Sequence, residues 1–66
     1  MSIAKTIEIT ANSEKSFEDA LKRGIAKAAE SLENITGAWI MDQSVTVNKD
    51  EIAEYTVRMK LTFVLK

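Results

Sequence analysis

The strongest constraint on the fold of this chain is an unbroken alternation of apolar and polar residues near its C-terminal end. Every odd position from Tyr55 to Leu65 is apolar, whereas the even positions from Glu54 to Thr62 are polar. A period of two is typical of a β-strand that buries one face. We therefore predict a strand over residues 52–65 whose odd positions face a core.

Two further strands are expected. Residues 3–10 alternate in the same way and predict a half-buried strand, which residues 11–13 end with turn and capping side chains. Residues 37–47 predict a long strand whose apolar phase changes, and a β-bulge at residues 42–44 would explain that change. The unbulged alternative places four apolar residues on one face: Trp39, Met41, Val45 and Val47. The polar residues 48–51 predict the turn of a hairpin.

A helix is expected between the first two strands. Ser16 begins a sequence similar to a capping box, and Ser13 is the competing N-cap. The apolar residues that follow recur at spacings of three and four and form one stripe, namely Phe17, Ala20, Leu21, Ile25, Ala28 and Leu32. Gly24 weakens the helix unless a neighbour packs closely against it. The helix is expected to end near Asn34.

These elements predict an α+β fold of order β-α-β-β, in which a three-stranded antiparallel sheet packs on one helix. The 66 residues allow one domain, residues 1–66. The expected helix of about 17–19 residues is about 27 Å long and covers only part of one sheet face. The other face has no second layer, although 45% of the residues are hydrophobic. We therefore expect the chain to form a homo-oligomer that covers this surface.

Composition excludes several classes of function. The chain has neither Cys nor His, which removes disulfides and the usual zinc ligands, and its net charge is −1 without a basic stripe that would grip nucleic acid. The carboxylates of Asp50, Glu51 and Glu54 are read as a solvated turn, so no metal site is expected. No pair of acid and base residues or activated nucleophile is apparent, and we expect no enzyme and no catalytic residue. Without a signal or membrane-spanning segment, the expected location is the cytoplasm.

Four segments carry a family resemblance. They are the turn into the helix at residues 10–17, the end of the helix at residues 26–35, the middle of the second strand at residues 41–43, and the third strand at residues 55–63. In this order and at this length the chain resembles the dodecins, which are small bacterial and archaeal flavoproteins that assemble as hollow dodecamers. The resemblance extends essentially without gaps from Ile7 to Leu65.

The resemblance implies a binding and storage protein. In flavin-binding dodecins, pairs of flavins lie at subunit interfaces, and each ring stacks on a tryptophan at the start of the second strand. A glutamine near the start of the third strand bonds the edge of the ring. The expected cofactor is therefore a flavin (riboflavin, FMN or FAD), and the expected partner is the chain itself, as a dodecamer.

This sequence departs from that pattern at both positions. Gly37 stands where flavin-binding members have the stacking tryptophan, and Thr56 stands where they have the glutamine. The candidate binding residues are therefore these two together with Trp39, which replaces the aromatic platform two residues later, and with Asp42 and Gln43 at the expected bulge. All of these candidates except Gly37 have a second reading. Trp39 is alternatively an interface or core residue, and Thr56 a solvent-facing strand residue. Asp42 and Gln43 alternatively form polar hydrogen bonds between subunits.

The alternative function is a dodecin-fold assembly protein that binds no flavin and is structural or binds a metal or another small ligand. Some family members that lack the stacking tryptophan bind no flavin, and a calcium-binding member is among them.

Overall fold

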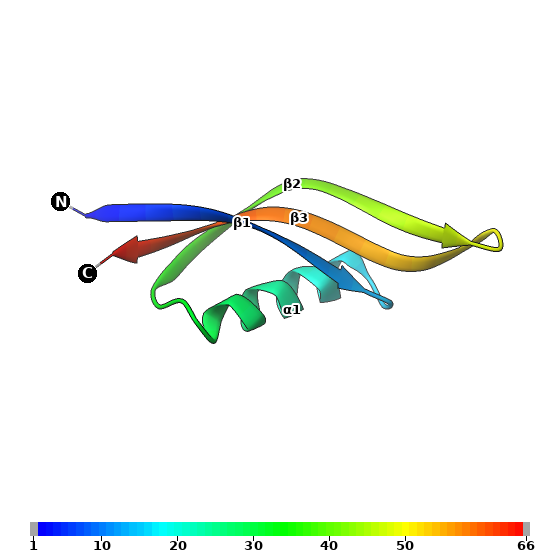
Figure 1. The fold of residues 1–66 in the computed structure, drawn as a ribbon, viewed down its shortest axis with the longest axis horizontal. Coiled ribbons are helices and arrows are strands. Elements are labelled where there is room, and N and C mark those ends of the chain that lie inside the picture. The colour runs from blue at the N-terminus through cyan, green and yellow to red at the C-terminus, as the bar shows by residue number, and fades with distance from the viewer. Residues whose placement is uncertain (1, 66) are drawn as a thin grey trace.

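The predicted β-α-β-β order is confirmed. The computed structural model describes residues 2–65, and its elements are β1 (Ile3–Ser13), α1 (Phe17–Ala29), β2 (Ile35–Asn48) and β3 (Glu51–Leu65). The three strands form one antiparallel sheet in the order β1-β3-β2 (Figure 1). The strand with the clearest alternation, β3, is therefore the central strand.

The core lies between α1 and one face of the sheet. Leu61 is paired with Ile7 on β1 and with Ala38 on β2, and its side chain is fully buried. The buried apolar residues are Ala20 on the helix and four odd positions of β3, namely Val57, Met59, Leu61 and Phe63. The alternation in the sequence therefore assigned the buried face of β3 correctly.

The first strand is longer than predicted. Ala11, Asn12 and Ser13 continue β1 and pair with Val57, Thr56 and Tyr55 of β3. The sequence predicts a turn here because Asn and Ser usually end strands. The neighbouring β3 extends equally far and satisfies the backbone groups of these residues, which overrides the local preference.

The helix begins as predicted and ends earlier. Ser16 is the N-cap, and its hydroxyl accepts a hydrogen bond of 2.9 Å from the backbone N–H of Asp19. The expected end near Asn34 is wrong, because α1 stops at Ala29. Asn34 instead has a left-handed backbone (φ 62°), and its carbonyl accepts a bond from the N–H of Val64. The chain must leave the helix early enough for β2 to pair with β3.

The start of α1 contains a small charge network. The Ser13 hydroxyl donates to Oδ2 of Asp19 at 2.5 Å, and Arg23 Nε donates to the same oxygen at 2.7 Å. The Ser13 bond, followed by the charge of Arg23, lowers the pKa of Asp19 below its ordinary value of 3.8, against an opposing effect of partial burial. Both bonds favour the ionised carboxylate.

This network makes stability depend on pH. A carboxyl whose pKa is lower in the folded state stabilises the fold above the unfolded pKa, and this stabilisation is lost as the pH falls through the folded pKa. We expect Asp19→Asn to reduce the fall in melting temperature between about pH 6 and pH 2, followed by circular dichroism. Glu18→Gln, which removes the exposed neighbouring carboxylate, is the control. Equal pH profiles for the wild type and Asp19→Asn would contradict this assignment.

Gly24 lies at a close contact between the helix and the sheet. It is buried, and a Cβ atom placed on it would lie 2.9 Å from the Cβ of Ala11 and 3.0 Å from the Cε of Met59. The Met59 methyl is the end of a flexible side chain, but the Ala11 Cβ is fixed to the β1 backbone. Glycine at this position therefore allows α1 to pack against β1.

We expect Gly24→Ala to destabilise the fold despite the higher helix propensity of alanine. Overpacking a core costs about 1–3 kcal/mol, whereas the gain in propensity is at most about 1 kcal/mol. Urea denaturation measures the difference. The same substitution in an Ala11→Gly background should cost less, because the fixed contact is absent. A stabilised Gly24→Ala protein would show that the helix can move away freely.

The predicted bulge is present, one residue earlier than expected. Ile40 pairs with Met59 and Asp42 pairs with Arg58, so Met41 is the additional residue. The unbulged alternative is wrong, because Trp39 and Val45 pair with residues on opposite faces of β3. Two further register shifts lie between Ile35 and Gly37 and between Thr46 and Val47. Lys49 and Asp50 form the predicted turn, both with left-handed φ angles, 51° and 64°.

The described chain is elongated. Its principal extents are 51 × 20 × 13 Å, and its radius of gyration is 13.6 Å, whereas a compact domain of this length has about 11 Å. Figure 1 shows the cause: the β2–β3 hairpin extends past one end of α1, and the start of β1 and the end of β3 extend past the other. None of the helical structure between residues 2 and 65 has the length and apolarity to cross a lipid bilayer.

Candidate functional site

The sheet face that points away from α1 carries most of the candidate binding residues. We call it the open face. It consists of the even positions 56–62 of β3 and the residues paired with them on the outer strands: Thr6, Glu8, Thr10, Asn12, Gly37, Trp39, Asp42, Ser44, Thr56, Arg58, Lys60 and Thr62. Side chains that pair across neighbouring strands project from the same face of a sheet. Four of the five predicted residues lie here.

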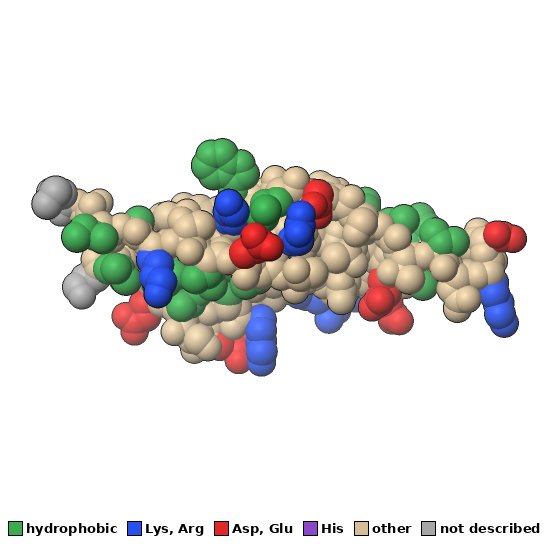
Figure 2. Space-filling model, turned by 45° about the horizontal axis from the view of Figure 1, so that its top comes forward, with side chains coloured by type: hydrophobic (Ala, Val, Ile, Leu, Met, Phe, Trp, Pro, Cys, Tyr) green, Lys and Arg blue, Asp and Glu red, His purple; other side chains and the backbone are tan. Residues whose placement is uncertain are grey.

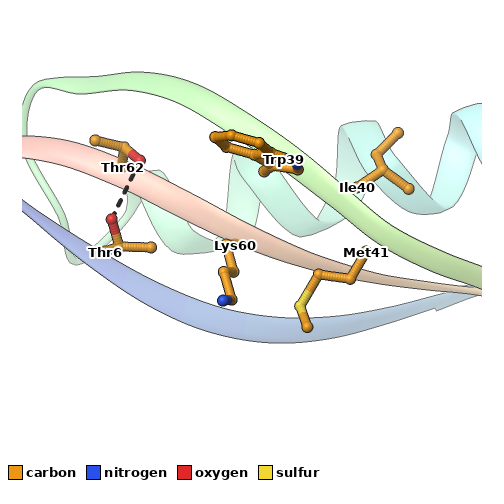
Figure 3. A pocket seen from close by; sticks show the side chains of 6 residues that line it. All are labelled: Thr6, Trp39, Ile40, Met41, Lys60 and Thr62. Atoms are coloured by element: carbon orange, nitrogen blue, oxygen red, sulfur yellow. Dashed lines mark hydrogen bonds between the residues drawn. The ribbon is translucent and has the colours of Figure 1, made fainter.

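A shallow hollow of about 640 Å³ opens on this face. Its lining comes from all three strands and consists of Thr6, Trp39, Ile40, Met41, Lys60 and Thr62. In Figure 3, Lys60 and Met41 extend in the direction of β1, and Thr6 and Thr62 form a hydrogen-bonded pair with 3.3 Å between their hydroxyl oxygens. The hollow therefore combines one aromatic surface, one cation and two hydroxyls.

Trp39 is the most exposed large apolar side chain among the described residues, at 75% of its full accessible surface. Its partner on β3 is Lys60, and the preceding pair on the same face is Gly37 with Thr62. A Cβ atom on Gly37 would have no described atom within 4 Å. The missing side chain at Gly37 thus leaves one side of Trp39 open.

Thr56 lies further along the open face. Its hydroxyl donates a hydrogen bond of 2.8 Å to Oδ1 of Asn12, the residue paired with it on β1. Since a threonine hydroxyl has one proton to donate, this bond leaves only its lone pairs for a ligand. Thr56 is not part of the lining of the hollow.

Asp42 and Gln43 point to different sides of the sheet. Asp42 pairs with Arg58 on the open face, and Arg58 Nη2 donates to Asp42 Oδ2 at 2.6 Å. The carboxylate of Asp42 raises the pKa of Arg58, first through this hydrogen bond and then through its charge. Gln43 pairs with Val57, whose side chain is buried on the helix side, so Gln43 projects away from the open face.

Five of the six residues that line the hollow were not among the candidates predicted from the sequence. Ile40 and Met41 directly follow Trp39 in β2. Thr6, Lys60 and Thr62 come from β1 and β3, and only the register of the sheet brings them beside Trp39. The alternation in β3 did predict that Lys60 and Thr62 point away from the core. Their partners across the sheet were not predictable, because residues 6 and 62 are far apart in the sequence.

No group of three or more acidic, His or Cys side chains in residues 2–65 is arranged to hold a metal ion. The three carboxylates near the hairpin turn, read from the sequence as solvated, form no such group.

Comparison with known proteins agrees with the fold described above. The family model described as Dodecin matches residues 3–66. No curated protein gives a significant match. The dodecin from Streptomyces davaonensis is 25% identical over 98% of this chain and 96% of its own, with a TM-score of 0.95.

Two further solved structures are similar. A mutant of the T. thermophilus dodecin superposes with a TM-score of 0.95 over 100% of this chain and 98% of its own, at 23% identity, and this likeness concerns the fold. The calcium dodecin from Mycobacterium tuberculosis, a calcium-chelating antigen with a novel calcium-binding site, is 25% identical over 98% of this chain and 93% of its own, with a TM-score of 0.86. The match to nearly the whole sequence and the shared β-α-β-β fold show that the chain belongs to the dodecin family.

Proposed function

We propose that this chain is a homo-oligomeric binding and storage protein that holds a flavin, or a similar flat ligand, against Trp39 on the open face. The observation that carries the proposal is the exposure of this tryptophan, at 75%, on a sheet face that no other described part of the chain covers. Exposing a large aromatic surface to water is unfavourable, and a flat ligand or another subunit removes that cost.

The hollow suits a ligand of this kind. Its volume, about 640 Å³, lies within the range of small-molecule pockets, roughly 300–1,000 Å³. Stacking a flat π-system on tryptophan contributes about 0.5–1.5 kcal/mol beyond the burial of apolar area. The space beside Gly37 gives the ring room, and the hydroxyls of Thr6 and Thr62 offer polar contacts at its edge. Trp39 would thus replace the aromatic platform that flavin-binding relatives carry two residues earlier.

Self-association is the second part of the proposal. Proteins of the dodecin family are homo-oligomers, and a dodecamer is the expected assembly. α1 packs on β1 and β3 and leaves β2 uncovered, so the helix-side face of the hairpin exposes apolar residues such as Val45, Val47 and Ile52. Figure 2 shows hydrophobic side chains at the surface along the β2–β3 hairpin. Neighbouring copies would bury them.

A flavin titration on material of known mass tests both parts. Protein measured by light scattering as a multiple of 7.4 kDa should quench the fluorescence of added riboflavin or FMN with saturation. Full flavin fluorescence at all protein concentrations would overturn the ligand proposal. A folded 7.4 kDa monomer would overturn the assembly proposal.

A flavin-free assembly protein is the second candidate, and one observation favours it. The two positions that contact flavin in the family pattern carry Gly37, which has no side chain, and Thr56, whose hydroxyl proton is already bonded to Asn12. The similar calcium dodecin shows a calcium-binding site in a chain of this fold. An assembled but flavin-free protein, together with calcium uptake by equilibrium dialysis, would select this candidate.

We further propose that the protein has neither a catalytic activity nor a nucleic-acid or membrane partner. Dodecins are small binding and storage proteins rather than enzymes, and we propose that this chain likewise performs no catalysis. Its net charge of −1 and its lysines, which are spread along the sequence, do not form the basic stripe that a nucleic-acid backbone needs. We propose a cytoplasmic protein that has no membrane or nucleic-acid partner.

A further inference from the structure

The lining of the hollow carries a single formal charge, and it is positive. Among its six residues only Lys60 is charged; the others are threonine, isoleucine, methionine and tryptophan side chains. Lys60 is exposed, and within residues 2–65 no ion pair involves it. Its ammonium group is therefore available to a ligand.

The other charges on the open face do not compensate Lys60 within the hollow. Arg58 and Asp42 form their own ion pair at 2.6 Å. Glu8 pairs with Lys60 in the register of β1 and β3, but it does not line the hollow, and its carboxylate is not within ion-pair distance of Lys60. Glu8 weakens the positive potential without cancelling it.

The threonine pair provides a second attraction for an anion. Thr6 and Thr62 have one hydroxyl proton each, and the hydrogen bond between their oxygens uses one of them. The other proton remains free to be donated to a ligand. Hydrogen bonds to a charged acceptor are roughly twice as strong as those between neutral groups.

From these contacts, and resting on the proposed function above, we infer that Lys60 is a specificity-determining residue that selects flat ligands bearing an anionic group over neutral ones. The aromatic ring lies against Trp39, and the phosphate or carboxylate of the ligand lies toward Lys60 and the Thr6–Thr62 pair. Among flavins, FMN carries such a group and riboflavin does not. Glu8 limits the size of the preference.

Fluorescence titration of the full-length oligomer with riboflavin and with FMN tests this inference through the ratio of the two affinities. An exposed ion pair typically changes affinity by up to about fivefold, so we expect FMN to bind about fivefold more tightly than riboflavin in the wild type. Lys60→Met, which keeps an unbranched side chain of similar length and removes the charge, should bring this ratio close to one. Added salt screens the charge of Lys60 and should likewise bring the wild-type ratio closer to one.

Two further variants complete the experiment. Glu8→Gln removes the opposing charge and should raise the ratio. Lys22→Met removes a lysine charge from the exposed side of α1, away from the hollow, and should leave the ratio as in the wild type. A wild type that binds both flavins equally, or a ratio that Lys60→Met does not change, would overturn the inference and leave flavin binding intact. A protein that binds neither flavin would overturn this inference and the ligand proposal together.

Discussion

Leu61→Ala should lower the free energy of unfolding by about 2–5 kcal/mol. The Leu61 side chain is fully buried at the centre of β3, beneath α1 and between the residues paired with it on β1 and β2. Alanine removes three carbon atoms and leaves a cavity that the tightly packed strands cannot close. A domain of this size has only roughly 3–10 kcal/mol of stability in total, so the substitution removes a large part of it.

Urea denaturation followed by circular dichroism measures this loss. Folding coupled to association makes the midpoint depend on protein concentration, so both proteins must be compared at the same concentrations. Lys60→Ala is the matched control, because it is the neighbouring residue on the opposite face of β3 and should change stability by less than about 0.5 kcal/mol. Similar losses for the two substitutions would mean that the helix does not cover the odd positions of β3.

Trp39→Ala should reduce flavin affinity by about 100-fold. The substitution removes the aromatic platform, and with it the stacking energy of about 0.5–1.5 kcal/mol and the apolar area that the ring would cover, at about 25 cal/mol per Å². Together these effects amount to roughly 2–3 kcal/mol, which corresponds to this change in the dissociation constant. Trp39→Phe keeps a smaller aromatic surface and should lose about tenfold or less.

Light scattering on the same samples separates the two readings of Trp39. If the side chain is a ligand platform, Trp39→Ala should keep the wild-type mass and lose flavin quenching. A variant that dissociates into smaller species, with unchanged affinity per assembled site, would identify Trp39 as a subunit contact instead. The folded core should survive either outcome, since Trp39 contributes to no buried cluster among the described residues.

The predictions that depended on periodicity were largely confirmed. The alternation over residues 55–65 identified a strand and its buried face, because a side chain in a strand alternates sides regardless of its neighbours. The change of phase in the second strand indicated a bulge, and the structure has one at Met41. The errors lie at element ends. β1 extends to Ser13 and α1 stops at Ala29 because pairing with β3 decides both boundaries.

The candidate site was predicted only in part. Gly37 and Trp39 were identified from their positions in the family pattern, and the structure places both on the open face. Gln43 was grouped with them but projects to the opposite side, since the additional residue in the bulge reverses the alternation after Ile40. The lysine of the hollow was read simply as a polar strand position.

By itself the sequence determined the buried faces of β3 and α1 and that one helix cannot cover this sheet, because periodicity and element length are local properties of the chain. Only the tertiary structure decided that β3 lies at the centre, and that Thr6, Trp39, Lys60 and Thr62 share one hollow. Strand order and register depend on contacts between residues distant in sequence, and shifting the pairing by one position would place different side chains around the tryptophan.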